Sequence, residues 1–560
     1  MTSWGEKRIR LGDDTTVSEL LSTAILQKRR FYVKRIVEVI CFLIENQLPF
    51  RGDWDAEEHR EAIQNELISI IAKLIEEDVV KDINSADVDF FTILVDGTKD
   101  RIHFEVVSVA VRYVLNGKAL ESLLGFLTTK ELDADSMTEL ILSKISNAGL
   151  DSHKILSQCY DGAKVISGNN GGIRRIIQNK IKRLIPYVHC INHRLHLVVI
   201  ASINGVYLAK SFFENVKLIY SFFRRTKVQA AYNGKSILNQ SYKRRLRKPS
   251  EDRGYTVGEN NNRKFDADDI AVATGMKQAI LKVEFLFMVT FMKEFLNYIA
   301  PADRILQSRD VGFREALPII DDVIRKVLGL QSISEFECIL KRSEELLSES
   351  PGETRLLRKK SRPSSLAAFI ITENVGERND DVNVELKSAF NEIIDIFQSQ
   401  MNRRFGENSK ILTAISEAQE LCYEKLLSLK QLGIKLPSRE ELSVAKTYLE
   451  RLKREHDKKE RAIVVSGGEN TFKNRFNVLF ELFKIREAFP VVYGMMAAVD
   501  TFGSSTAICE CSCSFSALER VGVSNRISVT EDRLRNLTFL AYEKKRVAKF
   551  YLLTRYYAAK

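Results

Sequence analysis

The chain has 560 residues, of which 45% are hydrophobic and 28% charged, a composition typical of a globular protein with about two to four domains. Lysine and arginine total 85 against 74 aspartates and glutamates, and the net charge of +11 favours an acidic partner such as nucleic acid. Eight cysteines, five of them widely scattered, exclude a secreted disulfide framework, and the most apolar run, Phe285–Met292, is too short to cross a membrane.

The first 87 residues are predicted to form a helical lead-in. Apolar residues recur at helical spacing in residues 31–50 and again in 63–75. The N-terminus has no apolar run and is not a signal peptide. We therefore expect a reducing compartment, which is the nucleus or otherwise the cytoplasm.

Residues 88–205 change to an alternating strand and helix pattern. Asn116-Gly117 predicts a hairpin, and Ser136 with Glu139 predicts a capping box at the start of a helix. Strands are predicted at 88–95, 105–115, 119–128, 155–160 and 187–190, and helices at 137–149, 173–184 and 193–202. The order β-β-β-α-β-α-β-α predicts an α/β fold with a ribonuclease-H-like core.

The rest of the chain is mostly helical. Residues 206–470 are predicted to be a large all-α insertion, with disordered loops near 239–268 and 348–363. The first loop carries a basic run that includes Lys243, Arg244 and Arg245, which is a candidate nuclear localisation signal or phosphate contact, with a solvated loop as the alternative. Residues 471–560 are predicted to complete the core.

Two aspartates come at the ends of predicted strands. Asp96 ends the first strand and Asp161 the fourth, and these strands are neighbours in a ribonuclease-H-like sheet. Their carboxylates would meet at one edge and share Mg²⁺, which prefers hard oxygen ligands. The competing interpretation is turn chemistry, because each aspartate precedes a glycine.

Several stretches of the chain match one family pattern in order and spacing. They are 31–51, 93–100, 111–114, 125–126, 159–163, 167–168, 187–195, 509–518 and 531–537. Through these stretches the chain resembles hAT-superfamily transposases, in the branch that includes MYM-type zinc-finger proteins. The resemblance implies a ribonuclease-H-like core with an Asp-Asp-Glu metal site, and a C-terminal dimerisation region.

The chain departs from the family pattern at several positions. Alignment on Ser514-Phe515-Ser516 places Ser512 where the family has its third acid, so Asp96 and Asp161 are expected to be vestigial. The usual N-terminal finger is missing before Phe31. Rescue by Glu510 or Glu519 would need a local shift, since a residue two positions away on a helix points about 200° elsewhere.

Other candidate sites are weaker. Cys190-x-x-His193 has metal spacing but lacks a second Cys/His pair nearby, so we expect no structural zinc. The family carries the same motif near its active site, which makes His193 a candidate DNA contact.

The leading hypothesis is a domesticated or degenerate transposase that dimerises through its C-terminal region, binds nucleic acid and has lost strand transfer and Mg²⁺. The alternative is an active Mg²⁺-dependent transposase or nuclease that uses Asp96, Asp161 and a relocated glutamate. A third is a protein-interaction scaffold without a DNA role. The expected partners are a second or further copy of the chain and nucleic acid, without a membrane.

Overall fold

The computed structural model divides into two compact units. Unit 1 comprises Met1–Tyr187 and Arg475–Lys560, and unit 2 comprises Val188–Asn474. The domain boundaries predicted after residues 87, 205 and 470 stay predictions. The residues that the structure describes are 23–45, 58–99, 105–129, 133–162, 172–225, 228, 267–308, 311–348, 378–406, 409–465, 476–513 and 531–550.

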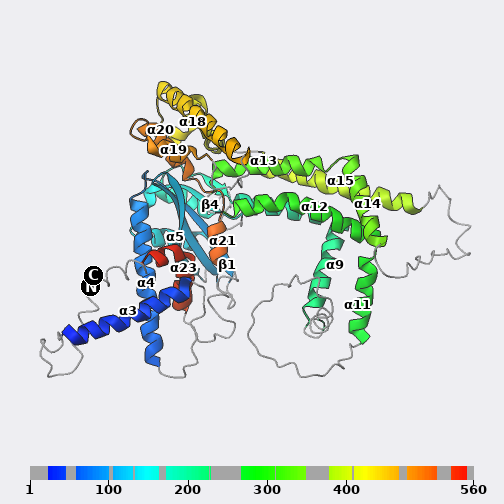
Figure 1. Cartoon of the computed structure of the whole chain (residues 1–560), viewed down its shortest axis with the longest axis horizontal. Helices are drawn as coiled ribbons and strands as arrows, with labels where there is room; N and C mark the ends of the chain where they lie inside the picture. The colour runs from blue at the N-terminus through cyan, green and yellow to red at the C-terminus, as the bar shows by residue number, and fades with distance from the viewer. Residues whose placement is uncertain are drawn as a thin grey trace, which may run out of the picture. The chain divides into compact units, whose positions relative to one another are not determined.

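A five-stranded mixed sheet forms the centre of unit 1, with the strand order β3-β2-β1-β4-β5 (Figure 1). β1 pairs antiparallel with β2 and parallel with β4, so the predicted neighbourhood of the first and fourth strands is confirmed. The strands are β1 (Phe91–Lys99), β2 (Glu105–Leu115), β3 (Lys118–Thr129), β4 (Ile155–Tyr160) and β5 (Tyr187–His189).

The hairpin between β2 and β3 turns at Asn116-Gly117, as predicted. Both residues have positive φ, at 53° and 69°, which a two-residue type I′ turn requires. A side chain at Gly117 is also excluded by packing, because a Cβ there would lie 2.5 Å from the Cβ of Phe483. The turn thus sets the register of β2 and β3, which pair from Leu115↔Lys118 onward.

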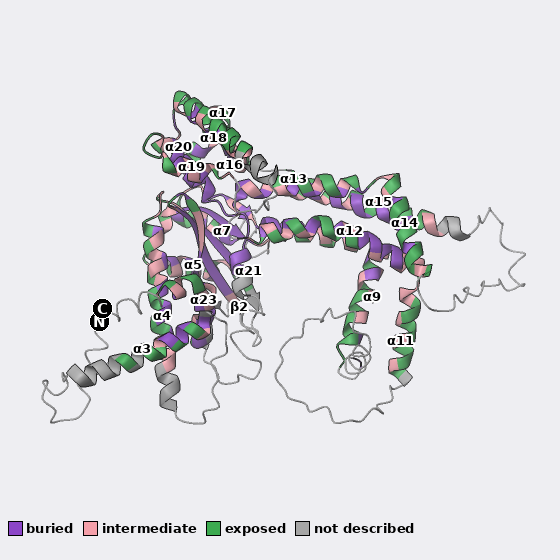
Figure 2. Ribbon diagram, in the orientation of Figure 1, coloured by how far each residue is buried: buried purple, intermediate pink, exposed green. Residues whose placement is uncertain are grey.

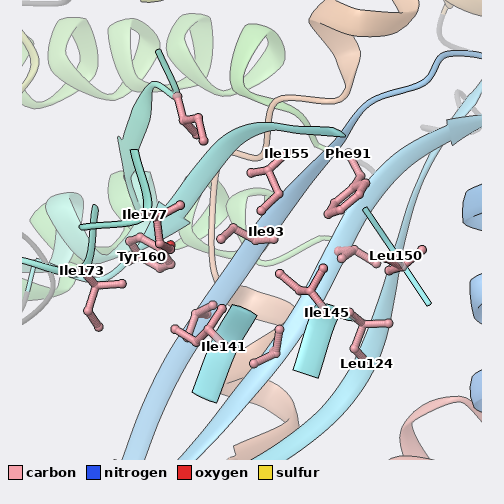
Figure 3. Close-up of a cluster of buried hydrophobic side chains, with 14 of the residues drawn as sticks. Phe91, Ile93, Leu124, Ile141, Ile145, Leu150, Ile155, Tyr160, Ile173 and Ile177 are labelled. Atoms are coloured by element: carbon pink, nitrogen blue, oxygen red, sulfur yellow. The ribbon is translucent and has the colours of Figure 1, made fainter. Parts of the chain in front are cut away.

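One face of the sheet is an apolar core. Odd-numbered residues of β1, such as Ile93, face α5 (Ala134–Asn147) and α7 (Ile173–Ile181). Figure 3 shows Ile141 of α5 and Ile177 of α7 beside Ile93, and all three are fully buried. Apolar residues at helical spacing on α5 and α7 explain why these helices bury this side.

The opposite face of the sheet carries polar side chains. Thr92 Oγ1 lies 2.6 Å from Ser157 Oγ across β1 and β4. Arg112 is 1% exposed; its Nη1 lies 2.9 Å from Glu121 Oε1, and its Nε donates to the carbonyl oxygen of Asp500 at 3.0 Å. Buried polar groups are retained when they find such partners.

The C-terminal helix α23 (Glu531–Tyr542) packs on α4 (Glu58–Asn84) within unit 1. Its Leu537 and Leu540 are buried. Beyond it, Glu543 accepts the backbone N–H of Leu123 at 3.0 Å, beside a bulge in the β2–β3 ladder. The C-terminal region therefore contributes to the core of unit 1.

The start of α5 differs from the prediction. Asp133 is the N-cap, and its Oδ1 accepts the backbone N–H of Ser136 at 2.8 Å. The predicted capping box at Ser136 is therefore wrong, because an acceptor three residues earlier satisfies the same turn. The predicted end is confirmed, since Gly149, with φ at 78°, follows the cap residue Ala148.

Apart from Val188 and His189 of β5, the described residues of unit 2 lie mainly in helices. Phenylalanines four residues apart on α12, Phe287, Phe291 and Phe295, are buried and meet Phe390 and Phe397 of α15. The ranges are α8 (Ile191–Gly205), α9 (Tyr207–Phe223), α11 (Ala267–Ile280), α12 (Val283–Leu306), α13 (Phe313–Gly329), α14 (Ile333–Ser348), α15 (Arg378–Phe405), α16 (Lys410–Ser416), α17 (Tyr423–Leu426) and α18 (Arg439–Val465).

The two units differ in how their elements are covered. The strands β1, β2 and β4 are mostly buried, whereas the long helices of unit 2 carry both buried and exposed residues (Figure 2). Within the described ranges no single helix is long and apolar enough to span a membrane, and α8 with α9 passes that test only as a pair bent by 104°. The loops predicted near 239–268 and 348–363 lie almost wholly outside the described residues.

Candidate functional site

Asp96 lies near the end of β1, on the polar face of the sheet. Side chains alternate along a strand, so Asp96 shares this face with Thr92 and Leu94. Asp96 is half-buried, and its carbonyl oxygen accepts a hydrogen bond from Ser108 Oγ of β2 at 3.3 Å. Three more residues of β1 follow it, so the prediction that Asp96 closes the strand is wrong by that margin.

Asp161 directly follows β4 and lies level with Asp96. The parallel register pairs Leu94 with Cys159 and Val95 with Tyr160, and its next step places Asp96 opposite Asp161. Tyr187 holds this end of β4 by donating its hydroxyl to the carbonyl oxygen of Asp161 at 3.1 Å. The predicted juxtaposition of the two aspartates thus follows from the strand pairing.

A third carboxylate reaches the same edge from the far end of the chain. Helix α21 (Ala507–Cys513) packs on β1 (Figure 1), where Cys509 Sγ donates to the carbonyl oxygen of Leu94 at 3.3 Å. The loop before α21 approaches as closely, because a Cβ on Gly503 would lie 2.6 Å from Leu94 Cδ2. Glu510 follows Cys509, and its Oε1 accepts the Thr506 hydroxyl at 3.0 Å.

The charges of these groups act on one another. The pKa of Asp96 is raised from 3.8 to about 7, first by burial and then by the negative charges of Glu510 and Asp161. Burial and like charges both disfavour a carboxylate. Two neighbouring acids therefore oppose the ionisation of Asp96, and a bound cation would relieve this repulsion.

The donor set fits a hard divalent cation in its chemistry. Asp96, Asp161 and Glu510 supply only carboxylate oxygens, which suit Mg²⁺. Among the described residues, however, no group of three or more His, Cys, Asp or Glu side chains is gathered closely enough to hold a metal ion. The side chains would have to draw closer to share one.

The other predicted site residues lie elsewhere. His193 is in the first turn of α8 in unit 2, where its backbone N–H donates to Cys190 Sγ at 3.5 Å and its ring centroid lies 5.6 Å from that of His189. Lys243, Arg244 and Arg245 lie outside the described residues. Ser512 is in α21, but its side chain is not among those described.

The role of Glu510 at this edge was underestimated from the sequence. The charge of Glu510 acts on Asp96, and the preceding Cys509, buried against β1, marks the face of the helix that contacts the sheet. The expectation that Glu510 needs a local shift to act as a ligand stays a prediction, since the described carboxylates are not gathered closely enough to hold a metal ion.

One comparison with known proteins bears on this site. Residues 55–172 match the family model DUF4371, described as the RNase-like domain of ZMYM1/FAM200. The matched segment contains β1 to β4, together with Asp96 and Asp161. The match supports a transposon-derived origin, and over this segment the chain is similar to the RNase-like domain of transposase-derived proteins of the ZMYM/FAM200 type.

Proposed function

We propose that this protein is a transposase-derived, ribonuclease-H-like nuclease that binds Mg²⁺ or Mn²⁺ through Asp96, Asp161 and Glu510 and acts on phosphodiesters of nucleic acid. The observation that carries the proposal is the arrangement at the edge of the sheet. Asp96 and Asp161 lie level on neighbouring parallel strands, and α21, fixed to β1 by Cys509, brings Glu510 to them.

Each side chain has a distinct part in the proposed site. Asp96 would be the central ligand, because both other acids act on its charge. Asp161 and Glu510 would hold the cation from β4 and α21. When bound, the cation supplies Lewis-acid activation of water and stabilises the leaving oxygen of a phosphodiester.

Glu510 takes the role that the hAT resemblance would assign to position 512. Ser512 still predicts impaired strand transfer, since a hydroxyl is a poor substitute for a carboxylate ligand. We therefore place hydrolysis of nucleic acid ahead of transposition. Nuclear localisation and contact of the basic run at Lys243, Arg244 and Arg245 with phosphates belong to the same proposal.

Dimerisation through residues 471–560 stays a proposal, and fewer observations support it than support the metal site. Leu537 and Leu540 are buried inside unit 1, so these two side chains are not a free surface for a second copy. Light scattering of the purified chain over a concentration series measures the oligomeric state directly. A monomer at all concentrations would remove dimerisation from the proposal.

The test of the site uses metal binding and cleavage together. Titration with Mn²⁺ is followed by calorimetry and by thermal unfolding, and cleavage of supercoiled plasmid is followed with Mg²⁺ or Mn²⁺. Asp161→Asn is expected to abolish cleavage, and Glu510→Gln to weaken metal binding by at least about tenfold, since even an outer partner of a metal site costs that much.

The matched control is Glu487→Gln, an exposed residue of unit 1 that loses the same charge. It is expected to bind metal and cleave as the parent does. If Glu510→Gln behaves like this control while Asp161→Asn is inactive, Glu510 is not a ligand. If the parent neither binds metal nor cleaves, the nuclease proposal fails and the degenerate transposase remains.

A further inference from the structure

The two aspartates of the proposed site are held by the sheet in different ways. Asp96 is paired within the ladder of β1 and β2, opposite Ser108, and β1 continues beyond it. Asp161 directly follows β4, and the ladder of β1 and β4 ends one residue earlier, at Val95↔Tyr160. The direction in which the chain leaves β4 at Asp161 therefore depends on contacts outside this ladder.

Tyr187 makes such a contact from the first position of β5. Its hydroxyl donates to the carbonyl oxygen of Asp161 at 3.1 Å. Its ring stacks on that of Tyr160, with the centroids 5.9 Å apart and an angle of 26° between the ring planes. Tyr160 is fully buried in the apolar cluster shown in Figure 3, and its hydroxyl donates to Gln158 Oε1 at 3.0 Å. The ring of Tyr187 thus rests on a side chain that is itself fixed.

Helix α7 also contacts Tyr187. The guanidinium of Arg174, in the first turn of α7, lies 5.2 Å from the ring centroid of Tyr187, within the range of a cation–π contact. Gln158 Nε2 donates to the carbonyl oxygen of Arg174 at 3.1 Å and to that of Ile185 at 3.2 Å. Because Gln158 is 1% exposed, it ties β4 firmly to α7 and to the segment before β5. These contacts limit the directions in which the Tyr187 hydroxyl can point.

Tyr187 approaches Asp161 from the apolar side of the sheet. Its ring packs on the cluster that the sheet shares with α5 and α7, and Tyr160 points to the same side. Side chains alternate along a strand, so the Asp161 carboxylate is expected on the opposite, polar side with Asp96. The hydroxyl contacts the main chain of Asp161, and Tyr187 can therefore orient this residue without competing for its carboxylate oxygens.

We propose that Tyr187 is a positioning residue of the metal site, whose hydroxyl holds the main chain of Asp161 so that the carboxylate stays level with Asp96. The inference rests on the proposed function, because it concerns a ligand of that site. A ligand that is held in place before the cation arrives loses less conformational freedom on binding. Removal of the hydroxyl is therefore expected to weaken metal binding although every carboxylate is retained.

The experiment compares Tyr187→Phe with the parent and with Tyr493→Phe in the full chain. Tyr493→Phe is the matched control, because it also removes a hydroxyl that donates within unit 1, there to Asp87 Oδ2 beside the β2–β3 turn. Calorimetry measures the affinity for Mn²⁺. Tyr187→Phe is expected to bind Mn²⁺ roughly tenfold more weakly than the parent, the usual loss for an outer partner of a metal ligand, and Tyr493→Phe to bind it as the parent does. Equal affinities of the two variants overturn the proposal.

The metal dependence of cleavage separates positioning from a structural role. At saturating Mg²⁺, Tyr187→Phe is expected to cleave plasmid at close to the parent rate, because the three carboxylates are unchanged. The Mg²⁺ concentration that gives half the maximal rate is expected to rise by the same factor as the Mn²⁺ dissociation constant. A variant that merely folds less well has fewer active molecules, so its rate at saturation falls while its half-saturating concentration stays the same. That result overturns the proposal.

Hydrogen exchange in EDTA keeps this inference distinct from the proposed function. Amides in the peptide spanning residues 155–162 are expected to exchange faster in Tyr187→Phe than in the parent or in Tyr493→Phe. Unchanged exchange, or faster exchange with an unchanged affinity for Mn²⁺, overturns the inference and leaves the proposed function standing. A parent chain that binds no Mn²⁺ overturns the proposed function, and the inference falls with it whatever the exchange shows.

Discussion

The two faces of the sheet in unit 1 are built from the same strands but do different things. The face toward α5 and α7 buries mainly aliphatic side chains, as Ile93 and Ile141 illustrate (Figure 3). The face toward α20 (Pro490–Asp500) and α21 buries hydroxyls, an ion pair and the half-buried Asp96. The first face stabilises the fold. The second face holds charged groups in place, and their burial lowers the free energy of unfolding.

The largest expected effect is on the apolar face. Ile141→Ala removes a fully buried side chain from α5 and leaves a cavity, which is expected to cost about 4 kcal/mol in unfolding free energy. Urea unfolding followed by circular dichroism measures the loss. Ile141→Val, which removes one methylene, should cost about 1 kcal/mol; equal midpoints for the two variants would show that this face is loosely packed.

The second prediction concerns Asp96 on the polar face, where a substitution is expected to raise the free energy of unfolding instead of lowering it. Because the pKa of Asp96 is about 7 in the fold and 3.8 in the unfolded chain, the folded state binds the proton more tightly. Ionised Asp96 therefore destabilises the folded state, and this destabilisation grows as pH rises from about 4 and is complete above about pH 7. In EDTA, Asp96→Asn is expected to stabilise the protein at pH 8 by on the order of 2–4 kcal/mol and to have little effect near pH 4.

Thermal unfolding of the parent and Asp96→Asn at both pH values checks this sign. A variant that is less stable than the parent at pH 8 would contradict the repulsion between Asp96 and its two acidic neighbours. Mg²⁺ added at pH 8 is expected to stabilise the parent and not the variant. This arm tests the same site without relying on cleavage.

The smallest effect concerns the hydroxyl pair of Thr92 and Ser157. Thr92→Val keeps the shape and leaves the fully buried Ser157 hydroxyl without this partner, which is expected to cost about 1–2 kcal/mol. The double variant Thr92→Val with Ser157→Ala removes both groups and is expected to recover part of the loss. A double variant as unstable as the sum of the single ones would mean that the two hydroxyls do not interact.

Much of the fold was predictable because its signals are local. Residues 105–115 and 155–160 are strands as predicted, the first closed by Asn116-Gly117, whose conformation few other residue pairs adopt. The N-cap of α5 was misplaced because Asp133 and Ser136 both have capping side chains, and the sequence does not show which one accepts. Local sequence rules thus predicted which helices and strands are present more accurately than they predicted the residues at which these elements begin.

The candidate site was predictable only in part. Asp96 and Asp161 could be brought together from the strand order, because parallel neighbours carry their ends to one edge. Glu510 could not, since its position depends on α21 packing against β1 through residues more than 400 positions away, as Cys509 and Leu94 show.

The long separation between β1 and α21 has a consequence for synthesis. Strands β1 to β4 leave the ribosome several hundred residues before Asp500 and Cys509, which cap Arg112 and the edge of β1. During that interval the face of the sheet that carries Arg112 is exposed, and such exposed surfaces tend to aggregate or to be bound by chaperones. Nascent chains stalled before residue 490 should therefore be retained by chaperones, whereas chains stalled beyond 550 should be released.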